Sequence, residues 1–183
     1  MATRQEWLDA SLERRLEHLA RTPTDLATAI DNQSDATLSR RPDGRNWCAK
    51  EIVCHLRDIE ELAILRFHTM LAMDDPKVLA VGAPLADPLA WGIGGDVPFP
   101  LDADRWAEER QYLRNDTRLA LEAFTRRRRE VLALLGGLTP AEWQRGCLHP
   151  TLGRIDFRDW TAGMAAHDDN HLAQLGRALQ GQA

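Results

Sequence analysis

Long apolar runs are missing from this sequence of 183 residues. No stretch approaches the roughly 18 consecutive apolar residues that a membrane-spanning helix requires. Residues 1–19, MATRQEWLDASLERRLEHL, carry charges throughout and lack the apolar region of a secretory signal peptide. We therefore expect a cytoplasmic protein that has no membrane partner.

The sequence contains few cysteines and has fewer basic than acidic residues. The three cysteines, Cys48, Cys54 and Cys147, are odd in number and form no CxxC pair. Neither a disulfide framework nor a zinc site made of cysteines is therefore indicated. The formal net charge of −5, from 23 basic and 28 acidic residues, argues against non-specific binding to nucleic acid.

One basic run, TRRRRE at residues 125–130, stands out against this acidic background. Four successive arginines spread around a helix instead of gathering on one face, and Glu122 and Glu130 stand where they can pair with them. A nucleic-acid surface would need more such charge on one face, ideally with aromatic side chains. We interpret the run as a solvated helix face and expect no nucleic-acid partner.

The composition is ordinary for a globular protein, with 44% hydrophobic and 28% charged residues. No linker or internal repeat is evident, so we assign residues 1–183 to a single domain. Apolar residues recur at intervals of three and four, the spacing of an amphipathic helix. Thr22-Pro23 marks either the start of a second helix or a bend in a continuous one. Helices are thus predicted over about 4–20, onward to about 33, 48–73, 104–135 and 157–179.

Residues 74–101 differ, because prolines and glycines occur there at a density that no helix survives. The sequence thus predicts an all-α fold, a four-helix bundle with a long crossover loop between the second and third long helices. The loop could cover a functional site with Trp91 as a wall, or be a strap in which Trp91 is buried for packing. We favour the strap. A connector over 146–153 and a helix cap at Asp156 complete the prediction.

Two histidines stand four residues apart in the last predicted helix, in HDDNH at residues 167–171. Residues at this spacing share one helix face, so His167 and His171 both fall on the apolar stripe. His55 falls on the apolar stripe of another predicted helix. Each inward imidazole needs a polar partner in a dry interior. A divalent metal would satisfy all three and leave an open position, as in catalytic zinc sites, and the same ligands suit nickel.

The alternative is that these are core histidines, each satisfied by a hydrogen bond within the protein. HxxxH arises by chance in many helices, and it is not the HExxH zinc motif, because Asp168 stands where that motif has Glu. The other histidines are weaker candidates. His68 faces away from His55 at the helical repeat. His18 lies in a charged segment that we interpret as surface, and His149 precedes a proline in the connector, where we expect a turn residue.

Two segments resemble the DinB-like (damage-inducible) family of helical bundles. GRNWCAKEIVCHLRDIEE at residues 44–61 resembles its W-S-x-x-E-x-x-x-H-L-x-D-x-E segment. HPTLGRIDFRDWTAGMAAHDDNHLAQL at residues 149–175 resembles its closing segment, which ends in H-x-x-x-H-x-x-Q. The resemblance implies a four-helix bundle with a metal bound by three histidines, here His55, His167 and His171.

The resemblance covers about residues 40–180 and also has functional implications. Better understood relatives, the bacillithiol S-transferases and the mycothiol-dependent maleylpyruvate isomerases, use the metal to activate a low-molecular-weight thiol. Two positions depart from the family pattern. Cys48 replaces the usual serine at a helix N-cap, and we expect it to be a buried, unreactive thiol. DFRDW stands where Thr or Ser commonly begins the last helix, so Asp156 takes over the cap.

Asp58 is the carboxylate that we single out beside the predicted ligands. It stands three residues after His55, where it could orient the imidazole or act as a general base. An ion pair with Arg57, Arg66 or another neighbour fits the sequence equally well. Gln174 could line the cavity or be solvated.

The favoured function is metal-dependent transfer of a low-molecular-weight thiol to an electrophile, with Zn²⁺ or Ni²⁺ as the cofactor. The alternatives are metal-dependent hydrolysis, a metal-stabilised stress-response bundle without catalysis, and a bundle without metal whose histidines form a hydrogen-bonded cluster. Relatives often pair through bundle helices, so a homodimer is a further expectation.

Overall fold

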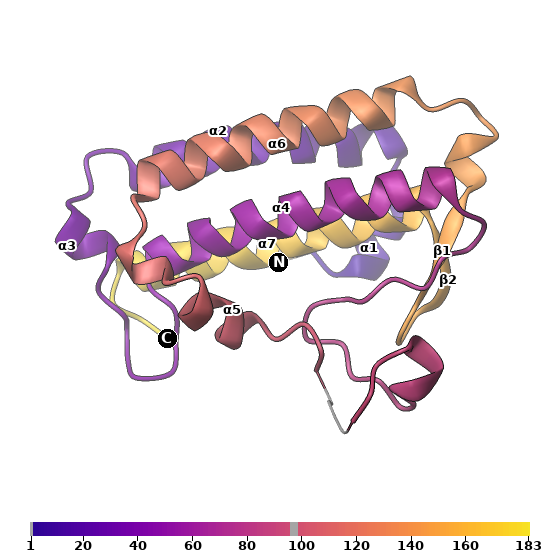
Figure 1. Ribbon diagram of the computed structural model, residues 1–183. Helices are drawn as coiled ribbons and strands as arrows, with labels where there is room; N and C mark the ends of the chain where they lie inside the picture. The colour runs from indigo at the N-terminus through magenta and orange to yellow at the C-terminus, as the bar shows by residue number, and fades with distance from the viewer. Residues whose placement is uncertain (1, 96–98) are drawn as a thin grey trace.

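Four long helices run alongside one another in the computed structural model, which describes residues 2–95 and 99–183 (Figure 1). Helix α4 packs chiefly against α6, and α2 against α7. The predicted all-α four-helix bundle, with its crossover between the second and third long helices, is confirmed. The four helices are α2 (Leu12–Ile30), α4 (Ala49–Ala72), α6 (Thr117–Gly137) and α7 (Phe157–Leu179).

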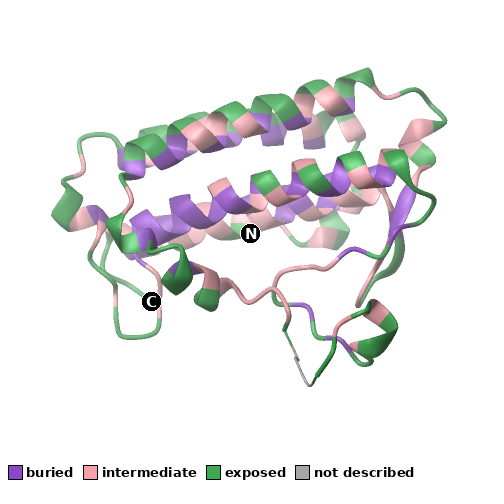
Figure 2. Ribbon diagram, viewed as in Figure 1, coloured by how far each residue is buried: buried purple, intermediate pink, exposed green. Residues whose placement is uncertain are grey.

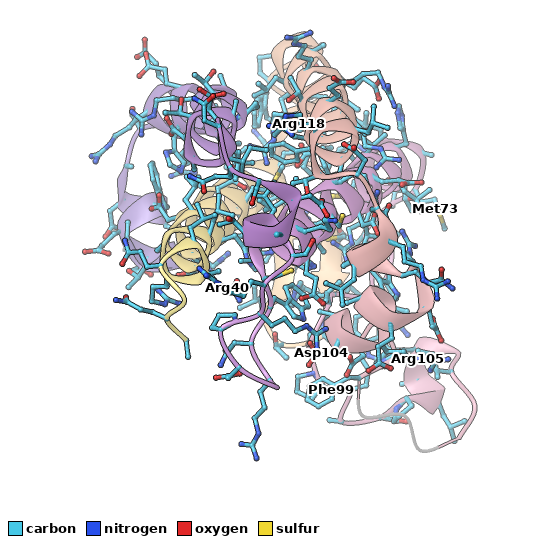
Figure 3. All side chains as sticks on the ribbon, turned by 90° about the vertical axis from the view of Figure 1, so that its left-hand side faces the viewer. Arg40, Met73, Phe99, Asp104, Arg105 and Arg118 are labelled. Atoms are coloured by element: carbon cyan, nitrogen blue, oxygen red, sulfur yellow. The ribbon has the colours of Figure 1, made fainter. Side chains whose placement is uncertain are left out.

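Apolar side chains fill the bundle interior in two clusters. One cluster contains the fully buried Phe67 and Phe157, and the other contains the fully buried Ile52 and Phe124. The buried faces of the long helices turn toward one another, and the exposed faces turn outward (Figure 2). Charged side chains such as Arg118 lie at the periphery (Figure 3). Burial of these apolar faces is the main force that holds the helices together.

The first predicted helix is broken into two. Helix α1 (Arg4–Asp9) ends before Ser11, whose side chain accepts a backbone N–H at 3.2 Å and begins α2. The prediction of one helix over 4–20 was wrong here, because a serine cap starts a new helix. Pro23 lies inside α2, so the continuous alternative for the second segment is confirmed. The hydrogen bond lost at a proline is tolerated because apolar residues on both sides are buried.

The third predicted helix is also interrupted. Helix α5 (Ala103–Glu109) is followed by the 3₁₀ turn η2 (Tyr112–Arg114) before α6 begins. Gln111 adopts a left-handed conformation with φ 51°, and the Asp116 side chain caps α6. The prediction of one helix over 104–135 was wrong. The apolar spacing continues through this segment, but the left-handed Gln111 and the Asp116 cap interrupt the helix. The turn brings its tyrosine, which is fully buried, against α4.

A small hairpin stands where the sequence predicted a connector. Strand β1 (Gly146–His149) pairs antiparallel with β2 (Gly153–Asp156). Gly146 has no room for a side chain, because a Cβ atom there would lie 2.6 Å from the carbonyl oxygen of Ile155. Asp156 caps α7 through a capping box, as predicted.

The crossover from α4 to α5 contains the 3₁₀ turn η1 (Leu89–Trp91), and residues 96–98 of this segment lie outside the described part. Backbone hydrogen bonds of 2.9 and 3.1 Å tie the crossover to Leu148 of β1. Trp91 is only half-buried, and the Lys77 ammonium lies 5.9 Å from its ring centroid. The prediction that Trp91 is buried for packing was therefore wrong, because the ring covers a lysine at the surface.

Two short elements complete the architecture. They are α3 (Asp35–Leu38), which follows α2, and the 3₁₀ turn η3 (Glu142–Gln144), which precedes the hairpin. Across residues 2–95 and 99–183, no helix combines the length and the apolar character needed to span a membrane.

Candidate metal centre

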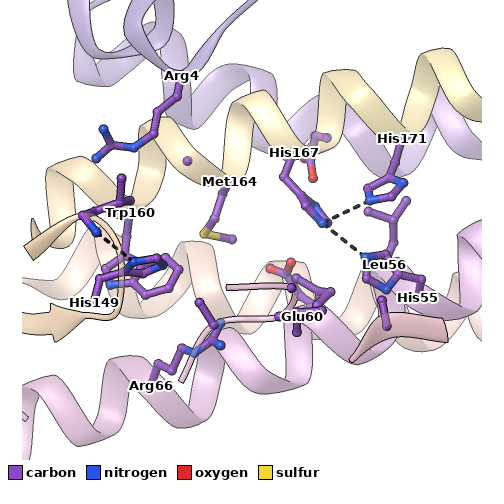
Figure 4. A pocket seen from close by; sticks show the side chains of 18 of the residues that line it. Arg4, His55, Leu56, Glu60, Arg66, His149, Trp160, Met164, His167 and His171 are labelled. Carbon is purple, nitrogen blue, oxygen red and sulfur yellow. Dashed lines mark hydrogen bonds between the residues drawn. The ribbon is translucent and has the colours of Figure 1, made fainter. Parts of the chain in front are cut away.

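Three histidine side chains from two helices meet in the bundle interior. His55 lies on α4, and His167 and His171 lie one turn apart on α7 (Figure 4). The Nε2 atom of His167 lies 3.3 Å from Nε2 of His55 and 3.1 Å from Nε2 of His171. One ring nitrogen from each residue lies within 4.8 Å of those from the other two. The structure therefore brings together the three residues that the sequence selected.

Two of the three spacings between these nitrogens fit a tetrahedral metal ion. At a zinc–nitrogen distance of about 2.0–2.1 Å, two ligands of a tetrahedral ion lie roughly 3.3 Å apart. The two Nε2–Nε2 distances of 3.1 and 3.3 Å match this value. Three protein ligands leave a fourth coordination position, as in catalytic zinc sites.

Hydrogen bonding alone does not account for this cluster. Nε2 of His167 lies within hydrogen-bond distance of two ring nitrogens, but one nitrogen of a neutral imidazole offers one proton or one lone pair. Burial lowers the pKa of His167 to about 3 and also lowers the pKa values of His55 and His171. The rings are therefore neutral near pH 7, the form in which imidazole binds a metal.

Neighbouring side chains hold two of the rings in place. The Gln174 Oε1 atom lies 2.8 Å from Nδ1 of His171 and accepts its proton, which leaves the Nε2 lone pair free. The Trp47 ring centroid lies 4.9 Å from that of His55 and 6.4 Å from that of His171. Nδ1 of His55 has no hydrogen-bond partner among the described residues. The sequence left open whether Gln174 lines the cavity or is solvated. In the structure it orients His171, a candidate metal ligand.

The histidines line one end of a cavity of about 400 Å³. Its walls come from α4, α7, the hairpin and residues 80–82 of the crossover. Figure 4 shows Met164 between the histidine cluster and an opposite end that contains Arg66 and His149. Part of the crossover thus lies over the candidate site, but Trp91 is not among the lining residues.

A buried group of three charged residues, Glu60, Arg128 and Asp168, stands beside the histidines; we call it the polar layer. Arg128 is 2% exposed and donates to both oxygens of Glu60 at 2.7 and 2.9 Å. It also donates to both oxygens of Asp168 at 2.6 and 3.1 Å. Asp168 accepts a further bond from the Thr22 hydroxyl at 2.6 Å. Since Asp168 directly follows His167, the polar layer fixes the part of α7 that carries two ligand candidates.

The pKa values of the polar layer follow from burial and pairing. Burial alone would lower the pKa of Arg128, but Asp168 and Glu60 more than offset it and raise that pKa. Burial pushes the pKa of Asp168 upward, and Arg128 reverses the shift, so the net pKa is lowered. Burial dominates at Glu60, whose pKa is raised. The arginine and Asp168 therefore form a charged pair in the interior.

The interpretation of the TRRRRE run as a solvated face was wrong for Arg128. This residue stands four after Phe124 and three before Val131, on the buried face of α6. That spacing is present in the sequence, but the two carboxylates that neutralise the arginine come from other helices. Arg129 is exposed, as predicted.

Asp58 is not part of the histidine cluster. Its carboxylate accepts hydrogen bonds from Arg57 at 2.7 Å and from the Tyr112 hydroxyl at 2.8 Å, and an Arg110 nitrogen lies 2.9 Å away. It is 3% exposed and does not line the cavity. Burial alone would raise its pKa, but Arg57 and Tyr112 lower it, so the group is ionised. The ion-pair alternative therefore holds, because Arg57, Arg110 and the Tyr112 hydroxyl of η2 hold the Asp58 carboxylate outside the cavity.

The other histidines divide into one confirmed and two corrected predictions. His68 is exposed and does not line the cavity, in agreement with the prediction that it faces away from His55. His18 is 7% exposed, and its Nε2 lies 3.2 Å from Asp169, so the surface position was wrong. Helix α1 folds back so that the Trp7 ring lies 4.6 Å from the His18 ring. His149, expected in a turn, lies in β1 and lines the far end of the cavity.

The three cysteines are buried, as predicted for Cys48. Burial raises the pKa of Cys48 to about 11 and that of Cys54 to about 12. At the start of α4, Glu51 accepts a hydrogen bond from the Cys48 backbone N–H at 3.0 Å, in the arrangement of a capping box. At neutral pH these thiols are protonated and are poor nucleophiles.

Comparison with known proteins agrees with this fold. The chain matches the DinB superfamily over residues 18–175. It is 21% identical over 164 residues to the Bacillus subtilis (strain 168) protein "Putative metal-dependent hydrolase YfiT", covering 89% of this chain and 81% of that protein.

A solved structure of YfiT from Bacillus subtilis shares the fold. It is described as a probable metal-dependent hydrolase with an unusual four-helix bundle topology. The TM-score is 0.74 at 19% sequence identity, covering 100% of this chain and 92% of the other. The family match spans most of the chain, and this chain belongs to the DinB superfamily.

Proposed function

We propose that this chain is a metal-dependent enzyme in which His55, His167 and His171 hold a divalent ion, Zn²⁺ or Ni²⁺. The observation that carries the proposal is the convergence of one ring nitrogen from each residue at the end of a cavity. Structural zinc sites close the ion in with four protein ligands, whereas catalytic sites use three. The name of the Bacillus subtilis relative, which includes metal dependence, supports the same conclusion.

The chemistry of the proposed centre comes from the ion and its surroundings. A divalent ion in this site would lower the pKa of a water molecule, or deprotonate a thiol, bound in the open position. The chain supplies three neutral imidazoles, a hydrogen bond from His171 to Gln174, and the polar layer that fixes α7. Imidazole ligands suit both zinc and nickel, so the two ions remain joint candidates.

Within this class we favour transfer of a low-molecular-weight thiol to an electrophile. The described carboxylates on the cavity wall are all engaged. Glu60 and Asp168 are bonded to Arg128, and Asp159 lies 3.7 Å from Arg4. None of them is free to act as the general base that activates water. A thiol is the more acidic nucleophile and has less need of such a base.

Metal-dependent hydrolysis is the second candidate. The name of the YfiT relative favours it. In that reaction Glu60 is the carboxylate on the cavity wall that would have to exchange its bonds with Arg128 to assist water. Replacing Glu60 by Gln would then lower hydrolysis even where the metal content is unchanged, whereas thiol transfer would depend on this carboxylate only through the polar layer that positions α7.

Cobalt substitution tests the proposal and separates the two reactions. Co²⁺-loaded protein is titrated with cysteine, glutathione, bacillithiol and mycothiol, and the visible spectrum is recorded. We expect at least one thiol to change the spectrum and to be transferred to an aryl chloride electrophile. A His68→Ala variant, altered at an exposed residue of the same helix as His55, serves as the matched control and should behave as wild type. Turnover of esters with no spectral response to any thiol would contradict thiol transfer and support hydrolysis.

A further inference from the structure

A buried arginine lies at the end of the cavity opposite the three histidines. Arg66 stands eleven residues after His55 on α4, a separation that returns to the same helix face and spans about 16 Å along the axis. Figure 4 shows Arg66 on one side of Met164 and the histidine cluster on the other. Arg66 is 7% exposed and lines the cavity. Its charge is therefore removed from bulk water but open to a ligand in the cavity.

The Arg66 guanidinium lacks the anionic partner that a buried cation ordinarily has. One terminal nitrogen donates to the carbonyl of Leu79, and the guanidinium carbon lies 5.1 Å from the Trp160 ring centroid. The Arg66 Nε atom has no hydrogen-bond partner in the described ranges. The guanidinium forms no ion pair with any carboxylate in these ranges. Burial lowers the pKa of Arg66 to about 10. Buried charges are normally paired, so this one is incomplete without a ligand.

His149 adds a hydrogen-bond donor at the same end. Its Nδ1 accepts from the backbone N–H groups of Thr151 at 3.2 Å and Leu152 at 3.3 Å. Burial, followed by the charges of Arg66 and Arg4, lowers the pKa of His149 to about 4. The neutral ring therefore carries its proton on Nε2, which is free of these two bonds.

One described arginine at this end of the cavity has no carboxylate partner. Arg4 lies 3.7 Å from Asp159, which offsets it. Glu60 lies between the two ends, and both of its oxygens are held by Arg128. Arg66 alone among the described arginines that line the cavity is paired with no carboxylate. Arg128 already faces two carboxylates, Glu60 and Asp168, so a ligand with one negative charge fits this end better than one with two.

Apolar side chains also line the cavity. Met164 of α7 lies between the two ends (Figure 4), and Ile59 of α4 and Ile155 of β2 are further lining residues. Apolar walls of this kind favour a hydrocarbon segment, while a few polar groups fix its orientation. The cavity thus combines a charged end, apolar lining residues and the candidate metal centre.

We propose that Arg66, assisted by His149 and Arg4, binds the carboxylate of a substrate whose apolar segment extends along the cavity toward the three histidines. The guanidinium fork is suited to a carboxylate, and the low exposure of the site strengthens the pairing. The assignment of the reacting part to the histidine end rests on the proposed function. Carboxylate binding by Arg66 does not depend on it and can be measured without a metal.

Binding of three matched six-carbon probes tests this proposal. Hexanoate, hexyl phosphate and hexan-1-ol are titrated into wild-type protein by ligand-observed NMR. Both protein as purified and protein stripped with a chelator are used, because a carboxylate also binds a metal. We expect stripped protein to bind hexanoate at least tenfold more tightly than hexan-1-ol, and no less tightly than hexyl phosphate. In Arg66→Gln the preference for hexanoate over hexan-1-ol should disappear, with hexan-1-ol binding unchanged.

Variants separate recognition from folding. Circular dichroism and urea unfolding establish whether Arg66→Gln is folded. Arg66→Lys keeps the positive charge but lacks the two parallel donors of the guanidinium. It should retain part of the preference for hexanoate over hexan-1-ol. Arg4→Gln should weaken hexanoate binding by a smaller factor. Arg118→Gln, at an exposed position on α6, is the control and should bind all three probes as wild type does.

Each outcome bears on one proposal at a time. Equal affinity of wild-type protein for hexanoate and hexan-1-ol would overturn carboxylate recognition, whether or not Arg66→Gln folds. Tighter binding of hexyl phosphate than of hexanoate would overturn the single-charge assignment. The double variant His167→Ala, His171→Ala should keep the hexanoate preference. If the protein holds no metal but keeps that preference, the proposed function fails and the Arg66 site stands.

Discussion

Arg128 of α6 holds both carboxylate oxygens of Asp168, the residue that follows His167 in α7. The same guanidinium holds both oxygens of Glu60 on α4. Three long helices are thereby joined at one buried cation next to the candidate metal centre. This network lies between the two apolar clusters and supplies a fixed orientation that apolar packing alone does not.

Replacing Arg128 by Met should destabilise the fold strongly. The substitution keeps much of the side-chain volume but leaves Asp168 and Glu60 buried without their partner. Removing one member of a buried ion pair typically costs about 3–5 kcal/mol, and we expect a loss of this order in urea unfolding. Arg129→Met, at an exposed neighbour, should change the free energy of unfolding by less than about 0.5 kcal/mol. Similar values for the two variants would refute the role of the network.

Asp58→Asn should leave metal binding intact. Its carboxylate is bonded to Tyr112 and Arg57 and does not face the cavity, so we expect a loss of stability and no change in metal affinity. Removing a group that orients a metal ligand typically costs about 10–100-fold in affinity. A change of that size in Asp58→Asn, measured by competition with a chelating dye, would restore Asp58 to the metal site.

Tyr112→Phe tests the same pair from the other side. It removes the hydroxyl that donates to Asp58 at 2.8 Å and leaves a buried acceptor with one bond fewer. We expect a destabilisation of about 1–2 kcal/mol, with metal content equal to that of wild type. Metal loss from a stably folded Tyr112→Phe protein would contradict this assignment.

Stability of the metal-free protein should fall as the pH is lowered from 7 toward 5. Burial depresses the folded-state pKa values of His55, His167 and His171 below their usual value of 6.5. Below that value the unfolded chain binds protons that the folded chain does not, so acid favours unfolding until the folded pKa is reached. The window for His167 therefore extends from about pH 6.5 down to about 3. Urea unfolding at pH 7.5 and 5.5 measures the effect.

The double variant His167→Ala, His171→Ala separates these residues from other titrating groups. It should lose less stability than wild type between the two pH values, because two of the buried imidazoles are absent. An equal pH dependence in both proteins would show that the histidines are not held neutral in the fold.

The local spacing of apolar residues was enough to predict most of the bundle and the three histidines. His167 and His171 share a face because they are four residues apart, and no tertiary information is needed for that. The helix breaks at Ser11 and Gln111 were not predicted, because the apolar spacing continues through both. The serine caps the start of α2, and the left-handed conformation of Gln111 interrupts the helix predicted over 104–135.

Residues whose role depends on partners from distant segments could not be placed from sequence. Arg128 is neutralised by carboxylates of α4 and α7, which lie 68 and 40 residues away. Asp58 lies near His55 in sequence, but Tyr112, which is 54 residues away, holds it. Arg66 and His149 meet at one end of the cavity only because the hairpin that carries His149 packs against α7. In each case the sequence shows the residue but does not show which distant residue contacts it.

Metal should raise the thermal stability of the protein. An ion that binds only the folded chain, at 100 times its Kd, adds about 2.7 kcal/mol, and for a chain of this size the melting temperature should rise by about 5–10 °C. Differential scanning fluorimetry of stripped protein with and without added Zn²⁺ or Ni²⁺ measures the shift. The double variant His167→Ala, His171→Ala should show no such rise, and His68→Ala should show it in full.

Metal content of untagged protein tests the central claim most directly. Wild type, His68→Ala and the double variant His167→Ala, His171→Ala are purified in parallel and measured by plasma mass spectrometry. We predict close to one equivalent of a first-row divalent metal in wild type and His68→Ala, and its loss in the double variant. Absence of metal from wild type, even after incubation with zinc or nickel, would show that His55, His167 and His171 form a polar cluster of the core and not a metal centre.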